Sequence, residues 1–174
     1  MNATLDDTSR RTTSRRRLLP LAAILVLMLT GLGANPASAK PQQVPFAAVV
    51  AGTLSPTSPT SFALKGTGLA TQLVLVKSYN ATVQITGGDL VNGPVMDTLT
   101  ETLTAPNGDS ITIRCQQVAY PVSPGSPVLI GSDKWTVIAG TGHFKNASGS
   151  GTGRTVADLG HGRFIKEMTG TIAY

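Results

Sequence analysis

The chain has few of the residues that build metal sites, disulfides and nucleic-acid-binding surfaces. Its 174 residues include one cysteine, Cys115, and two histidines, and only 5% of them are aromatic. A single cysteine excludes an intramolecular disulfide, and one cysteine with two distant histidines argues against a zinc site. Few and scattered aromatic residues argue against stacking platforms for nucleic acid. Stability must therefore come from packing and from sheet hydrogen bonds.

The sequence also lacks the short motifs of common enzyme classes. Neither GxGxxG nor GxxxxGK[ST] occurs, so the glycine-rich stretches do not indicate a phosphate-binding loop. The absence of GxSxG leaves a hydrolase of the nucleophile-elbow type unsupported. His143 and His161 lie in predicted turns, which favours exposed positions over catalytic ones. Cys115 shares an alternating face with Ile111 and Ile113, which predicts a small packed hydrophobe with no activating base beside it.

Arginine is concentrated near the N-terminus and is followed by apolar sequence. Five arginines between Arg10 and Arg17 precede the apolar run 18–32, and Ala37-Ser38-Ala39 has the small-x-small pattern of a signal-peptidase site. Residues 1–39 are therefore predicted to be a secretory signal peptide. The apolar run is short of the ~20 residues that span a bilayer, and no second run follows. We expect no stable membrane anchor after cleavage.

Two export routes stay open for this leader. Ser14 to Leu19 resembles the twin-arginine export signal, although Pro20 stands where that pattern usually has lysine. An ordinary basic n-region in a general secretory signal explains the same residues. Either route predicts a secreted, extracellular protein whose mature part begins at Lys40.

Removal of the leader also changes the charge. The whole chain has a formal net charge of +5, but residues 40–174 hold nine basic and seven acidic residues, which gives +2. A strongly basic surface would indicate nucleic acid as a partner. Because the arginines lie in the predicted leader, we expect no nucleic-acid partner.

Residues 40–174 predict a single all-β domain. They are rich in Thr, Val, Gly and Ser, with turn signals at short intervals and no convincing long helical period. We expect about eight strands, at 44–54, 61–69, 72–86, 95–105, 110–118, 134–139, 147–159 and 163–173. An even number of antiparallel strands in up-and-down order can close into a barrel, which removes exposed edges.

Proline and glycine mark the predicted ends of strands. The two prolines of segment 55–59 are expected to close the first strand, because proline removes a ladder donor. Asn107-Gly108 between two alternating runs predicts a β-hairpin with a type I′ turn, in which both central residues have positive φ. The proline-rich segment 121–127 predicts an exposed loop.

The run 140–151, GTGHFKNASGSG, is the most distinctive local pattern. Gly140 and Gly142 allow positive φ, so the backbone can turn sharply and place Phe144 in the barrel end as a plug. The later glycines, which continue to Gly153, alternate along one strand face and give the coiling that barrel closure needs. These roles are structural.

This run resembles the GTGxF-x-x-A-x-G-x-G motif of the allene oxide cyclase and dirigent-like β-barrels, which include secreted bacterial members. The resemblance extends to the strand from Trp135 to Ala139 and, more loosely, to Thr104–Asp109. It implies a calycin-like, eight-stranded antiparallel barrel with an apolar cavity. Members of these families cyclise fatty-acid epoxides or orient phenoxy radicals, and related bacterial barrels cyclise polyketides, all without a metal or organic cofactor. No site motif of theirs matches here, so the resemblance assigns no catalytic residue.

Charged residues interrupt strand faces that are otherwise largely apolar, and Asp97 lies on the same face as Glu101. Lys77 shares a face with Tyr79, while Glu101 and Lys166 interrupt the faces of the fourth and the last predicted strands. If these faces point inward, the charged side chains meet in the lumen, where a buried charge is costly unless paired. Lys77, Tyr79, Glu101 and Lys166 are therefore the candidate ligand-binding residues. The alternative is a bulge that reverses the register, or lysines at a rim that reach water.

Three functions stay open at this point. The first is an exported barrel that binds a small hydrophobic molecule in its lumen. The second is a cofactor-free cyclase or isomerase, or a dirigent-like protein, in which Lys77 and Glu101 handle protons. The third is a structural secreted protein whose lumen is filled by side chains. We expect no cofactor and no metal, and association into a homo-oligomer is compatible with the sequence.

Overall fold

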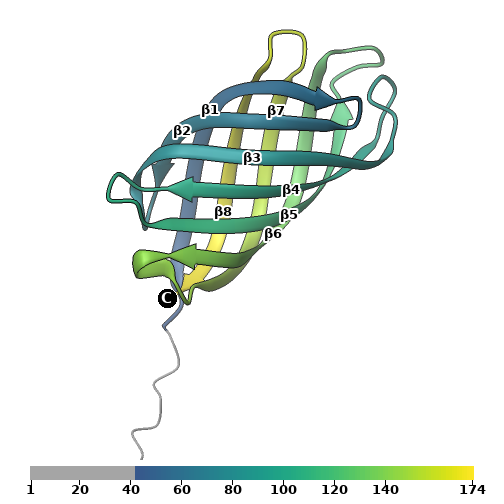
Figure 1. The fold of residues 1–174 in the computed structure, drawn as a ribbon. Coiled ribbons are helices and arrows are strands. Elements are labelled where there is room, and N and C mark those ends of the chain that lie inside the picture. The colour runs from purple at the N-terminus through teal and green to yellow at the C-terminus, as the bar shows by residue number, and fades with distance from the viewer. Residues whose placement is uncertain (1–41) are drawn as a thin grey trace, which may run out of the picture. The chain divides into compact units, whose positions relative to one another are not determined.

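The computed structural model describes residues 42–174, so the predicted leader lies outside the described residues. Eight antiparallel strands follow one another around a closed barrel in chain order, and β1 pairs with β8 to close it (Figure 1). The strands are β1 (Val44–Ser58), β2 (Ser61–Ala70), β3 (Val74–Gly88), β4 (Val95–Thr104), β5 (Ser110–Pro121), β6 (Val128–Thr141), β7 (Ser148–Asp158) and β8 (Arg163–Ala173). The predicted all-β, eight-stranded antiparallel barrel is confirmed. Nothing in this described part forms a helix long and apolar enough to cross a membrane.

The two ends of the barrel are built differently. The loops that follow β1, β3, β5 and β7 gather at one end, which we call the mouth, and the remaining connections lie at the opposite end (Figure 1). At that opposite end a 3-10 turn, η1 (Gly142–Phe144), connects β6 to β7 and buries Phe144 in the core. The predicted plug is confirmed, and we call this end the plugged end.

The two glycines before the plug act in different ways. Gly142 has a φ of 56°, as its turn requires. Gly140 does not have positive φ, and its role is instead to let two backbone segments approach, since a Cβ there would collide with the carbonyl oxygen of Phe144. The positive φ predicted for Gly140 is therefore wrong, although the sharp turn is present.

Several strands are longer than the sequence pattern predicts, and β1 and β6 differ most. β1 continues through Pro56 to Ser58, because Pro56 lies where the ladder to β2 shifts register and so removes no regular hydrogen bond. β6 begins at Val128 rather than at residue 134, since its first residues pair with the end of β5 and with β7. This second difference determines which side chains of β6 face the interior.

The β4–β5 hairpin is present, but its turn is not of type I′. Gly108 N donates to Ala105 O at 3.0 Å and Ala105 N donates to Asp109 O at 2.8 Å. Gly108 takes a φ of 92° while Asn107 has an ordinary negative φ. A longer turn with one left-handed glycine therefore replaces the predicted pair of left-handed residues.

The core near the plugged end is apolar and closely packed. Phe46 and Trp135 meet edge to face with ring centroids 5.5 Å apart. A Cβ on Gly151 would lie 2.5 Å from Trp135 Cζ2, and one on Gly170 would lie 2.6 Å from it. The glycines that alternate along β7 therefore face inward and make room for large side chains that cross the lumen.

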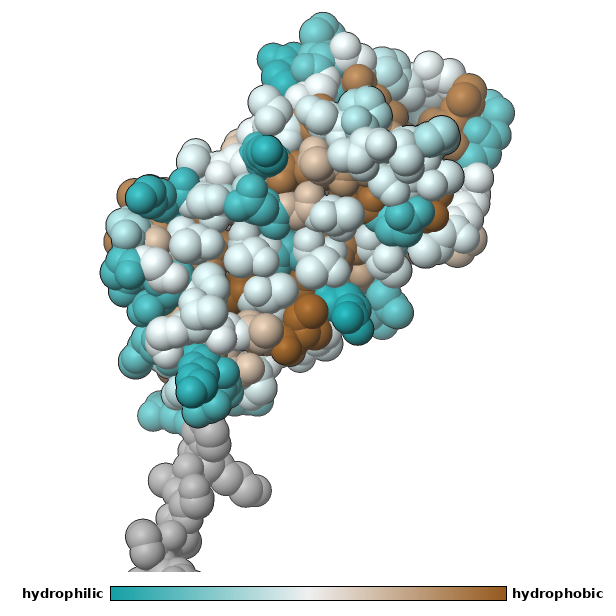
Figure 2. Space-filling model, in the orientation of Figure 1, coloured by the Kyte–Doolittle hydropathy of each residue, from teal (hydrophilic) through white to brown (hydrophobic). Residues whose placement is uncertain are grey.

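The outer face of the barrel is mixed in polarity. The side drawn in Figure 2 is mostly hydrophilic or intermediate, with separate hydrophobic patches between. The most exposed large apolar side chains are those of Val74 at 77% and Leu69 at 63%. Association into a homo-oligomer through this face stays a possibility raised by the sequence alone.

Candidate functional site

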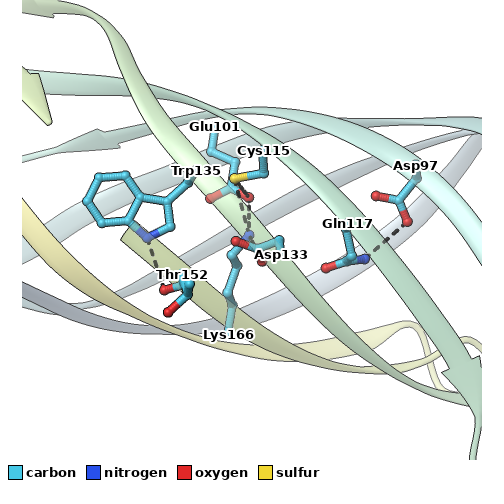
Figure 3. Close-up of polar contacts among 8 residues, drawn as sticks. All are labelled: Asp97, Glu101, Cys115, Gln117, Asp133, Trp135, Thr152 and Lys166. Carbon is cyan, nitrogen blue, oxygen red and sulfur yellow. Dashed lines mark hydrogen bonds and ion pairs between the residues drawn. The ribbon is translucent and has the colours of Figure 1, made fainter. Parts of the chain in front are cut away.

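A group of buried polar side chains occupies the barrel interior between its middle and its mouth (Figure 3). The strands bring them together from opposite sides of the barrel, because alternate residues of β4, β5, β6, β7 and β8 point inward. The members are Asp97, Glu101, Cys115, Gln117, Asp133, Thr155 and Lys166. A lumen of this size would ordinarily be filled with apolar residues, so this group is the candidate functional site.

Lys166 is the centre of the charged part of this group. Its side chain is fully buried, and its Nζ donates to Glu101 Oε1 and lies 2.9 Å from Asp133 Oδ2. The contact with Asp133 is an ion pair without the geometry of a hydrogen bond, since Asp133 Oδ2 has no hydrogen-bond partner. Burial alone lowers the pKa of Lys166, but the charges of Glu101 and Asp133 outweigh it and hold that pKa above its ordinary value. Lys166 is therefore a charged ammonium inside the barrel.

Cys115 has a partner that sequence reasoning did not find. Its Sγ donates to Glu101 Oε1 at 3.2 Å, and Lys166 Nζ lies 3.6 Å from the same sulfur. The expectation that no base lies beside Cys115 is therefore wrong, although the expected burial is confirmed. Burial, and then the charge of Glu101, raises the pKa of Cys115, so the group stays a thiol and is a poor nucleophile.

Asp133 is the charged residue that the sequence pattern missed. It is 5% exposed and faces the interior of β6 in alternation with Trp135. Gly153 on the neighbouring strand makes room for it, since a Cβ there would lie 2.7 Å from Asp133 Oδ1. The predicted strand began one residue too late, at 134, to include this position. Extending the alternation backward from Trp135 would have found it.

Lys77 does not belong to this group. The ladder between β2 and β3 pairs Gly66 with Tyr79 but Gly68 with Val76, so β3 contains one extra residue. This bulge turns Val76 and Tyr79 inward and leaves Lys77 exposed on the outside. The interior position expected for Lys77 is therefore wrong, and the alternative of a bulge that reverses the register is the one observed.

The other three sequence candidates face the interior. Glu101 and Lys166 are fully buried and paired, as expected for two charges that share a lumen. Tyr79 is also fully buried and packs on Phe164 with ring centroids 5.5 Å apart, but its hydroxyl has no partner. Burial, and then the charge of Glu101, raises the pKa of Tyr79 well above its ordinary value. A ligand-binding role for these three residues stays a prediction.

A small apolar cavity lies between the charged group and the mouth loops. Its volume is about 40 Å³. Leu54, Phe62 and Leu129 lie on its wall, and Asp97, Gln117 and Thr155 form its polar base. We call this cavity the mouth pocket. The interior is thus mostly filled by side chains rather than open.

The polar base of the mouth pocket is incompletely hydrogen-bonded. Asp97 and Gln117 lie opposite each other on β4 and β5, and Gln117 Nε2 donates to Asp97 Oδ2 at 3.1 Å (Figure 3). Asp97 Oδ1, Gln117 Oε1 and Thr155 Oγ1 have no partner. Burial raises the pKa of Asp97 to about 6, although the bond from Gln117 and the charge of Lys166 oppose this change.

Two loops contribute to the wall of the mouth pocket, and the β5–β6 loop is hydrogen-bonded to both of them. Leu90 from the β3–β4 loop and Leu159 from the β7–β8 turn form part of its wall. Gly125 N donates to Val91 O at 2.9 Å, and Leu159 N donates to Pro127 O at 2.8 Å. Few backbone bonds therefore join these loops, and such segments open at lower free energy than strands of the barrel wall.

Neither histidine takes part in this interior group. His143 is exposed at the plugged end, on an open groove of about 540 Å³, and His161 is exposed in the β7–β8 turn, 2.8 Å from Asp158 Oδ2. Over the residues that the structure describes, no group of three His, Cys, Asp or Glu side chains is arranged to hold a metal ion.

No protein-family model matches the chain, and no curated protein matches it. The resemblance of the run 140–151 to the allene oxide cyclase and dirigent-like barrels stays a prediction. Function must therefore be argued from the geometry of the interior.

Proposed function

We propose that the protein binds a small, largely apolar molecule in the mouth pocket, with the polar part of that molecule on Asp97, Gln117 and Thr155. One observation carries this proposal. An apolar-walled pocket ends on three side chains that are each at least 92% buried, and each has one atom without a partner. Pockets that combine apolar walls with a few convergent polar groups are the usual form of small-molecule sites.

A purely structural barrel explains these residues less well. Leaving one buried polar atom without a partner costs about 1–3 kcal/mol, and three such atoms meet at this base. The plugged half of the same barrel is filled by apolar side chains around Trp135. The chain therefore fills the plugged half of its lumen with apolar side chains and places polar side chains only from the middle toward the mouth.

Binding requires the mouth loops to separate. A volume of about 40 Å³ is far below the roughly 300–1,000 Å³ of typical small-molecule pockets. Val91 and Val122, on the β3–β4 and β5–β6 loops, are 56% and 55% exposed. Movement of Leu90 and Leu159 would enlarge the pocket without breaking the barrel ladder.

The predicted signal peptide and the family resemblance support an extracellular setting for this function. A binding barrel exported to the medium would meet its ligand outside the cell. Both features belong to the proposal, as does the ligand-binding role of Tyr79, Glu101 and Lys166, which lie beneath the polar base.

Cofactor-free acid–base catalysis is a second candidate, and Asp97 is the observation that favours it. A carboxyl with a pKa of about 6 beside a pocket can both give and take a proton near neutral pH. Asp97 replaces Lys77 in this role, because Lys77 lies outside the barrel. A compound retained by the protein and converted by the wild type but only bound by Asp97→Asn would support catalysis.

The binding proposal is tested by blocking the pocket. Ala157 lies on its wall, whereas Ala139 is exposed on the outer face of β6 near the plugged end. We expect Ala157→Phe to weaken binding of the fluorescent apolar probe N-phenyl-1-naphthylamine at least about tenfold, which is about 1.4 kcal/mol. Ala139→Phe should leave it unchanged. Native mass spectrometry of protein purified from its own culture medium should show a retained small molecule in the wild type. Equal probe binding by both variants would refute the proposed site.

A further inference from the structure

The base of the mouth pocket offers hydrogen-bond acceptors. Gln117 turns its amide nitrogen toward Asp97 Oδ2, so its Oε1 faces away from that carboxylate and accepts no bond (Figure 3). Asp97 Oδ1 is a second free acceptor, and the Thr155 hydroxyl can accept or donate. A molecule seated on this base must therefore bring hydrogen-bond donors.

The charges around the polar base of the mouth pocket also disfavour an anionic ligand. The buried ionisable side chains with carboxyl or ammonium groups are Asp97, Glu101, Asp133 and Lys166, three acids against one base. Lys166 is already engaged by both Glu101 and Asp133. No buried cation in the described part of the chain is left to meet an anionic ligand, and a like charge beside Asp97 would be strongly unfavourable at this degree of burial.

We propose that the mouth pocket selects molecules whose head group donates hydrogen bonds, namely alcohols and amines, and rejects carboxylates of the same length. The head group would donate to Asp97 Oδ1 and to Gln117 Oε1, with Thr155 as a third partner. The apolar body would extend among Leu54, Phe62 and Leu129 toward the mouth. This inference rests on the proposed function and adds the chemical class of the ligand.

Three compounds of equal chain length test the selection of the head group. Octan-1-ol, octylamine and octanoate differ only in the head group, and each is titrated against the complex of the mature protein with N-phenyl-1-naphthylamine at pH 7.5. We expect the alcohol and the amine to displace the probe at concentrations at least about tenfold lower than octanoate, a difference of about 1.4 kcal/mol. Octanoate that competes as well as octan-1-ol would overturn the inference while the pocket stands.

The remaining outcomes are also decisive. If the fluorescent probe binds and none of the three compounds displaces it, the head group is not selected and the inference fails. If the fluorescent probe itself does not bind, the proposed function fails with it. The two failures are therefore distinguishable in one set of titrations.

Variants of Asp97 and Gln117 test whether these two residues select the head group of the ligand. Asp97→Asn removes the negative charge. The concentration of octanoate that displaces the fluorescent probe should then come within about threefold of that of octan-1-ol, a difference of about 0.6 kcal/mol. Gln117→Leu removes one acceptor and should weaken octan-1-ol about tenfold while leaving the fluorescent probe bound. Glu167→Gln, on the exposed face of β8, is the matched control and should change neither ratio. If both Asp97→Asn and Gln117→Leu keep the selectivity of the wild type, these two residues do not select the head group.

Discussion

The two halves of the barrel interior are built on the same strands and differ in their chemistry. In the plugged half the single indole donor of Trp135 reaches Thr152 O at 3.0 Å, and the surrounding side chains are apolar. In the middle and toward the mouth, charged and amide side chains replace them, and all the buried side-chain atoms without a partner in the described residues lie there. One half satisfies the requirements of a protein core and the other does not.

This difference shows which interior residues the barrel fold requires and which it does not. An antiparallel barrel requires an inward-facing residue at every second position, and apolar residues meet that requirement at the plugged end. The buried polar atoms without a partner in the middle and toward the mouth destabilise the barrel, so their presence points to a purpose other than stability.

Removal of the buried ammonium should be the most damaging change in the mouth half. Lys166→Met leaves Glu101 and Asp133 buried beside each other without their counter-charge. Breaking a buried ion pair in this way costs about 3–5 kcal/mol, comparable with the ~3–5 kcal/mol expected for Phe144→Ala at the plug. The free energy of unfolding from urea titration measures both.

The matched control for Lys166→Met is the variant that also neutralises the two acids. Lys166→Met combined with Glu101→Gln and Asp133→Asn should recover most of the lost stability, because no uncompensated charge stays buried. Phe144→Ala has no such rescue, since its loss comes from a cavity. A single Lys166→Met variant as stable as the wild type would show that the buried charges are not coupled.

The pH dependence of stability should come from the mouth half. Because the folded-state pKa of Asp97, about 6, exceeds its ordinary value of 3.8, the folded protein holds this proton more tightly than the unfolded chain does. The stabilising contribution is complete below pH 4 and is lost as the pH rises through 6, by about 3 kcal/mol in all. Asp97→Asn should flatten this slope and be more stable than the wild type at pH 7. Urea unfolding at pH 4, 5, 6 and 7 would show whether the slope belongs to Asp97.

The alternation of residues along the strands was enough to predict the barrel and part of its interior. Glu101 and Lys166 lie on strands without a bulge near them, so counting by twos places both inside. The plug at Phe144 followed from the glycines around it. Regular stretches of strand thus carry their orientation in the sequence.

Asp133 was missed on a regular stretch because the predicted strand began too late, but the other errors fall where the backbone departs from this regularity. One extra residue in β3 moves Lys77 outside, and Val74, just before it, has the left-handed φ of 61° that a branched side chain rarely takes. Nothing in the sequence around these positions marks either feature. The contact of Cys115 with Glu101 and the mouth pocket depend on how strands and loops meet in space, which alternation does not describe.

The smallest predicted effect compares one glycine from each half. A Cβ on Gly151 would collide with the backbone oxygen of Thr169 and with the Trp135 ring, neither of which can move far. At Gly131 the nearest atoms, 2.5–2.9 Å from a Cβ, all belong to the Gln117 side chain, which can turn toward the mouth pocket. Gly151→Ala should therefore destabilise the protein by about 1–3 kcal/mol through overpacking, and Gly131→Ala by less than about 1 kcal/mol. Thermal and urea unfolding of the two variants make the comparison. Equal losses would mean that the interior near the mouth is as rigid as the plugged core, and that the pocket has no room to adapt to a ligand.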